Sequence, residues 1–141
     1  MSRKKLSIIS IILKEPIKKL WIEQTYRTPE IKFSYGNLSL RGTFVPIDPV
    51  AFYLPLLKWV SKYSIAPAPV TVVDIGLKYT RGFAMNYIQK LLQELILLNN
   101  ENHQVIINWY FSANSIDKKA GEHLSRKLDY PFNFVEVEEI W

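Results

Sequence analysis

The chain contains no cysteine, only two histidines and no apolar run long enough to cross a bilayer. Without cysteine there is no disulfide framework, no thiolate nucleophile and no thiolate zinc site, and a reducing compartment is permitted. His103 and His123 have no carboxylate or second imidazole at ligand spacing, so we expect surface histidines and no metal site. A nucleophile elbow, a P-loop and a zinc-protease motif are also missing, so we expect neither catalytic residues nor a cofactor.

Positive charge is concentrated at the amino-terminal end. Residues 1–19 carry six of the 18 basic residues and one of the 13 acidic ones, which leaves twelve of each in residues 20–141. A nucleic-acid footprint should lie on a folded face, so this neutral remainder predicts no nucleic-acid partner. We therefore divide the chain into a basic extension, residues 1–19, and a single regulatory domain, residues 20–141.

The extension contains an apolar run of eight residues, from Leu6 to Leu13, which is too short to span a membrane. Lys14, Glu15 and Pro16 follow where a signal peptide would have small residues. An added strand and a membrane-surface or partner-docking arm both stay open. Membrane contact is expected only through residues 1–19, and we expect a cytoplasmic protein.

The first half of the domain alternates apolar and polar residues. Residues 20–26 predict an edge strand, and residues 31–44 predict two antiparallel strands joined by a hairpin turn at Tyr35–Leu38. Asp48 and Pro49 are typical of a helix start, and Pro55 predicts a kink or a delayed start in that helix.

The second half alternates strands with helices. A buried strand at Val70–Tyr79 leads into a helix at Phe83–Leu98, and a strand at Val105–Phe111, a helix at Asp117–Leu128 and a strand at Asn133–Val137 follow. The order predicts an α/β (α+β) fold, a single mixed β-sheet with about three helices packed on it. Within it, Trp59 and Trp109 are predicted core residues, and Asp74 should face solvent or pair with a base.

The junction between the central strand and its helix is the candidate functional site. Because parallel strands present their carboxyl ends to helix N-termini, unpaired N–H groups are expected there. The candidate partner-binding residues are Tyr79, Thr80, Arg81, Gly82 and Phe83. Arg81 could meet an acidic partner or remain a solvated cation, and Gly82 supplies backbone freedom at the turn.

Several motifs in a fixed order resemble one family. They are Thr28-Pro29-Glu30-Ile31, Leu38-Ser39-Leu40-x-Gly42 with Pro46, Trp59-Val60, Tyr79, Asn108-Trp109-Tyr110 and Pro131-Phe132. Together they resemble the SiaC-type family of bacterial regulatory phosphoproteins, long known only as a domain of unknown function, over residues 22–134. The resemblance implies a non-enzymatic protein-binding domain similar in shape to anti-sigma-factor antagonists.

The same resemblance implies a phosphorylation-controlled partner switch. In the family, a kinase phosphorylates a threonine in a Tyr-x-Asn-Thr-Ser-Ser motif at this junction, and a PP2C-like, metal-dependent phosphatase reverses the modification. The unphosphorylated form can bind and activate a diguanylate cyclase, which implies a role in cyclic-di-GMP signalling and biofilm formation. A phosphate would add nearly two negative charges to a docking surface suited to a neutral hydroxyl.

The phosphoacceptor motif is degenerate in this chain. Counting without a gap from Tyr79 places Gly82 at the acceptor threonine, and Thr80 is the nearest hydroxyl. Two interpretations stay open. Either the chain keeps phosphorylation control through Thr80, or it has lost that control and binds its partner constitutively. We favour the second. A small-ligand module or enzyme using a cleft at Tyr79–Phe83, and a membrane adaptor using the basic arm, are the alternative functions.

Overall fold

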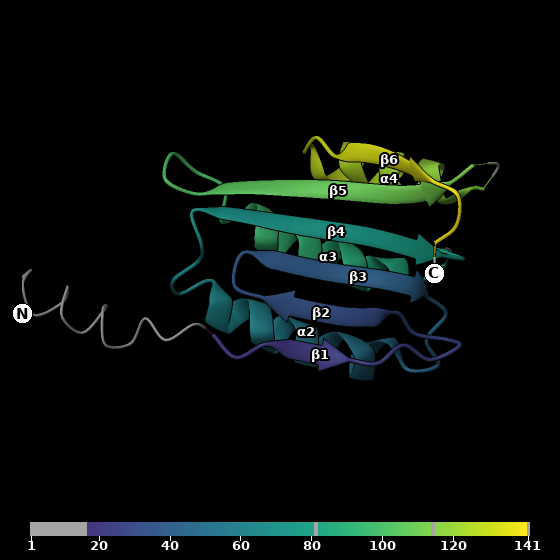
Figure 1. Cartoon of the computed structure of the whole chain (residues 1–141), viewed down its shortest axis with the longest axis horizontal. Helices are drawn as coiled ribbons and strands as arrows, with labels where there is room; N and C mark the ends of the chain where they lie inside the picture. Colours follow the sequence, from purple (N-terminus) through teal and green to yellow (C-terminus); the bar gives the residue numbers. More distant parts are fainter. Residues whose placement is uncertain (1–16, 81, 114, 141) are drawn as a thin grey trace, which may run out of the picture.

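The structure, a computed structural model, describes residues 17–80, 82–113 and 115–140. Its elements are β1 (Leu20–Ile22), β2 (Glu30–Ser34), β3 (Asn37–Thr43), α2 (Pro49–Tyr63), β4 (Val70–Lys78), α3 (Met85–Ile96), β5 (Gln104–Ser112), α4 (Asp117–Leu128) and β6 (Asn133–Val137) (Figure 1). The predicted order of strands and helices is confirmed, although the predicted edge strand is shorter than the stretch assigned to it.

All six strands form one mixed sheet in which the spatial order is the chain order. β1, β2 and β3 pair in antiparallel fashion, whereas β3 to β6 pair in parallel. One helix connects each pair of neighbouring parallel strands, and each new strand is added on the same side of the strand before it. Crossovers of one hand then place α2, α3 and α4 on the same face, as Figure 1 shows. The predicted fold class is confirmed.

Two local predictions in the first half are confirmed, the first of them in part. Ser34 pairs with Asn37 and Phe33 with Leu38, so the hairpin turn is Tyr35–Gly36 and is shorter than the predicted Tyr35–Leu38, and Gly36 has a φ of 82°. Asn37 keeps an ordinary strand backbone, so the glycine alone supplies the positive φ. The Asp48 carboxylate accepts the Ala51 amide at 3.1 Å and caps α2.

Helix α2 begins at Pro49 and continues through Pro55. The alternative of a delayed start at Pro55 is therefore wrong, because the Asp48 cap and a proline in the first turn are enough to start the helix upstream. A kink at Pro55 stays a prediction.

The core lies between the sheet and the three helices. Trp109 is completely buried, and its indole N–H donates to the Asp117 carbonyl at 2.8 Å. A Cβ on Gly121 would lie 2.6 Å from the same ring, so α4 packs on the indole without any intervening side chain. Trp59 is also buried, which confirms both predicted core tryptophans.

The opposite face of the sheet carries polar side chains. Asp74 on β4 accepts from two neutral donors, the Asn108 amide at 3.0 Å and the Tyr110 hydroxyl at 3.3 Å. Burial, and then the nearby Asp74 charge, raise the pKa of Tyr110 above its usual range, which keeps that phenol a donor.

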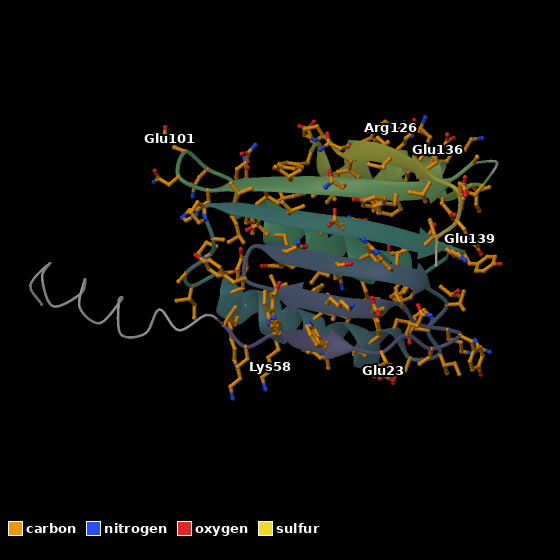
Figure 2. The ribbon with its side chains drawn as sticks, in the orientation of Figure 1. Glu23, Lys58, Glu101, Arg126, Glu136 and Glu139 are labelled. Carbon is orange, nitrogen blue, oxygen red and sulfur yellow. The ribbon has the colours of Figure 1, made fainter. Side chains whose placement is uncertain are left out.

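The carboxyl-terminal residues return over this polar face. Ile140 is only 2% exposed, and its side chain lies against Gly76, the one residue of β4 without a side chain. The Glu139 carboxylate lies 3.8 Å from the Lys78 ammonium, beside the carboxyl end of β4 (Figure 2). Glu139 therefore lies close to the candidate junction.

Most of the predicted extension lies outside the described residues, so its division from the domain stays a prediction. Ile17 packs against the core, and the Lys18 carbonyl accepts the Trp59 indole N–H at 2.7 Å. Among the described residues, no helix has the length and apolarity needed to cross a membrane.

Candidate partner-binding site

The loop from Tyr79 to Ala84 joins β4 to α3 and contains the five predicted site residues. Tyr79 has a φ of 60° and is 57% exposed, so a bulky side chain occupies the left-handed region on the surface. Such a conformation costs on the order of 1 kcal/mol and is concentrated at functional sites. Gly82 has a φ of 81° with open space around it, which fits its predicted role in the turn. Arg81 lies outside the described residues.

Helix α3 begins at Met85, two residues after the predicted start at Phe83. Its N-cap is Ala84, which has no side-chain group to accept an amide. Instead, the amides of residues 85–87 donate to the carbonyls of residues 82–84 at 3.3, 3.1 and 3.1 Å. This tight first turn uses amides that we expected to be unpaired, so it weakens the case for an anion or a small ligand bound by the helix N-terminus.

Thr80 is buried, whereas Tyr79, Gly82 and Phe83 of the same loop are exposed. Its side chain is 6% exposed, and its hydroxyl has no hydrogen-bond partner among the residues that the structure describes. A phosphoryl group on this oxygen needs space that the loop does not provide in this conformation. Among the described loop residues, the surface therefore contains Tyr79, Gly82 and Phe83 and not the Thr80 hydroxyl.

Large apolar side chains are exposed on three loops that follow parallel strands. Phe83 is 74% exposed after β4, Val45 and Ile47 are exposed after β3, and Ile116 is exposed after β5. Because β3, β4 and β5 are parallel, their carboxyl ends meet at the same edge of the sheet. We give the name apolar edge to these four residues together with Tyr79, that is, to Val45, Ile47, Tyr79, Phe83 and Ile116.

Sequence reasoning found only the β4 part of the apolar edge. Val45 and Ile47 alternate with Pro46 and Asp48, and that pattern predicts only the end of the sheet and the start of a helix. The signal that could find them is an apolar residue in the loop after each of three parallel strands. An exposed apolar group of this kind on adjoining loops is typical of a protein-docking surface.

A groove between α3 and α4 opens beside the apolar edge. Its cavity volume is about 390 Å³, and Thr80 and Gly82 line one end. His123 lies in this groove and is exposed as predicted, but His103 is half-buried, with its ring Nδ1 3.3 Å from the Ala68 carbonyl. No cluster of three metal-binding side chains occurs within residues 17–80, 82–113 and 115–140.

The model of the SiaC family of regulatory phosphoproteins matches residues 22–137. A search of curated proteins finds no significant match. Among solved structures, SiaC of Pseudomonas aeruginosa is 20% identical, with a TM-score of 0.72 over 84% of this chain and 96% of that one. The complex of the diguanylate cyclase SiaD with its activator SiaC from the same bacterium matches with a TM-score of 0.75 at 20% identity, over 84% of this chain and 99% of that one. At this identity, the likeness demonstrates a common fold.

Proposed function

This chain belongs to the SiaC family of regulatory phosphoproteins, and we propose that it binds and activates a diguanylate cyclase through the apolar edge. In one of the similar structures, SiaC of Pseudomonas aeruginosa is in complex with the diguanylate cyclase SiaD, of which it is the activator. By analogy, this chain acts as a regulator without catalytic chemistry of its own. It works in the cytoplasm, where the GTP consumed by such a cyclase is found.

The exposed rings of Tyr79 and Phe83 are the observation that supports this surface most strongly. Burying both rings against a partner would remove apolar surface from water. Each Å² of apolar surface buried in this way stabilises the complex by about 25 cal/mol. Aromatic side chains on the rim of a rigid sheet are also common binding hot spots, because they lose little conformational freedom.

We further propose that the chain binds its partner constitutively. The family's acceptor position falls on Gly82, and the neighbouring Thr80 hydroxyl is buried. Both features support a loss of phosphorylation control. A kinase and a PP2C-like phosphatase would then recognise the domain without changing its binding to the cyclase. Thr80 stays the one serine or threonine in this loop on which a kinase could act, after the loop opens.

Cyclase activation tests the proposal directly. Purified chain, without kinase treatment, is titrated into a diguanylate cyclase from the same organism, and cyclic-di-GMP formed from GTP is quantified. We expect the rate to rise to saturation with the wild type and to stay basal with Phe83→Asp, which places a charge on the apolar edge.

The matched control is Leu97→Asp, because Leu97 is equally exposed but lies at the other end of α3. This variant should activate as the wild type does. Absence of activation by the wild-type chain, or equal loss in both variants, would contradict the proposed function or its surface.

A further inference from the structure

Two cavities between the outer surfaces of α3 and α4 form one continuous groove. The first, of about 390 Å³, begins at Thr80, and the second, of about 230 Å³, continues to Gln93. They share Asn86, Gln89 and Lys127. We call this combined feature the α3–α4 groove. It follows α3 from its first turn almost to its last, so it is longer than a site for a single small anion.

The charge of the α3–α4 groove has one sign. Lys90, Lys119 and Lys127 line it together with His123, and none of the residues that line it is acidic. None of these three lysines is in an ion pair with a described residue, and the Lys90 ammonium lies 5.2 Å from the centroid of the Tyr87 ring. The groove lysines therefore present uncompensated positive charge on a domain whose overall charge is close to neutral.

Two of the groove lysines lie on α4. Lys119 and Lys127 are eight residues apart on one helix, which corresponds to about 12 Å along its axis. Carboxylates seven or eight residues apart on a second helix would have nearly the same separation. Met85 and Ile116, of which Ile116 is 55% exposed, line the groove beside these charges and provide an apolar strip.

We propose that the α3–α4 groove binds an acidic amphipathic helix of the partner protein. Glutamate or aspartate side chains of that helix pair with Lys119 and Lys127, and its apolar residues pack on Met85 and Ile116. The inference deepens the proposed function, and rests on it for the identity of the partner.

A protein segment fits these observations better than free phosphate does. The helix N-terminal amides of residues 85–87 are already bonded, so the backbone donors typical of a phosphate site are occupied. The cationic side chains are instead distributed along the groove, as a helix with several carboxylates requires.

A synthetic helix tests this assignment with the full-length chain. The probe is an amphipathic peptide with a leucine stripe flanked by glutamates four and seven residues apart, and a second peptide has lysine in place of each glutamate. Binding is measured by fluorescence anisotropy at low and at physiological salt. We expect the glutamate peptide to bind, more weakly as salt rises, and the lysine peptide not to bind.

Two double variants locate the contact. Lys119→Glu/Lys127→Glu should weaken binding of the glutamate peptide by roughly tenfold or more, because two attractive contacts become repulsive. The control is Lys118→Glu/Arg126→Glu, which makes the same change of charge one residue earlier on the same helix. Lys118 and Arg126 line neither part of the groove (Figure 2 labels Arg126), so this variant should stay within about twofold of the wild type.

Equal weakening in both variants, equal binding of the lysine peptide, or full displacement of the probe by millimolar inorganic phosphate would overturn the inference. The cyclase assay separates it from the proposed function. If Lys119→Glu/Lys127→Glu activates the cyclase as well as the wild type does, the groove assignment fails while the function stands. If the wild type does not activate the cyclase but still binds the glutamate peptide in the groove, the function fails and the groove assignment stands.

Discussion

Helices α2 and α3 both follow a parallel strand, yet their first turns are built differently. At α2, Asp48 caps the Ala51 amide and proline occupies the first helical position. At α3, the N-cap is an alanine with no side-chain hydrogen bond, and Tyr79, in the loop before it, has a positive φ. The first junction follows the local rules of helix stability, and the second departs from them.

The difference indicates where the chain retains a surface for a partner. Local rules are broken most often at functional sites, because a binding residue is selected for its exposure and shape. Large apolar side chains are exposed at both junctions, but only the α3 junction combines them with a strained backbone and a missing cap. If this junction serves binding while the rest of the helix serves stability, substitutions in the two regions should have separable effects.

The largest expected effect is in the body of α3. Leu91 and Leu95 are buried to 1% and 0% exposure, and Leu91→Ala or Leu95→Ala should lower the free energy of unfolding by about 2 to 5 kcal/mol. Urea denaturation followed by circular dichroism measures this change. A loss near zero at both positions would mean that the helix does not anchor on the core, and the comparison with α2 would have no basis.

A smaller effect is expected at the capped junction. Asp48→Ala removes the acceptor of the Ala51 amide and should cost about 1 kcal/mol of unfolding free energy. Binding to the diguanylate cyclase, measured by titration calorimetry, should be unchanged once the variant is shown to be folded. Reduced cyclase affinity in this variant would show that the Asp48 carboxylate itself contacts the partner, beside Val45 and Ile47 of the apolar edge.

The two junctions also differ in how well their structure could be predicted from the sequence. Asp48, Pro49 and Gly36 have local signals, and the structure confirms the turn and the helix start that they predict. The inward direction of Thr80 was not predictable, because alternation along β4 says nothing about a side chain after the strand ends. The packing of Ile140 on Gly76 depends on contact between distant segments, although a glycine inside an apolar strand is a hint of close approach.

The smallest expected effect on stability is at Tyr79. Tyr79→Gly relieves the positive φ but gives the unfolded chain more freedom, so the free energy of unfolding should change by less than about 0.5 kcal/mol. Cyclase affinity should nevertheless fall, because the exposed ring is lost. Tyr79→Asn also accommodates the backbone and should show the same loss, which would attribute the effect to the ring. A destabilisation above about 1 kcal/mol in both variants would instead make the ring a structural element.

The central claim is that this junction binds its partner without phosphorylation control. The direct test incubates the chain and Thr80→Ala with ATP and the family kinase from the same organism, then maps any phosphate by mass spectrometry and measures cyclase affinity before and after. We predict no stoichiometric phosphate on the chain and the same affinity in all samples. Stoichiometric phosphate on Thr80, together with lost affinity that Thr80→Ala resists, would contradict constitutive binding and show that the switch has moved two residues along the loop.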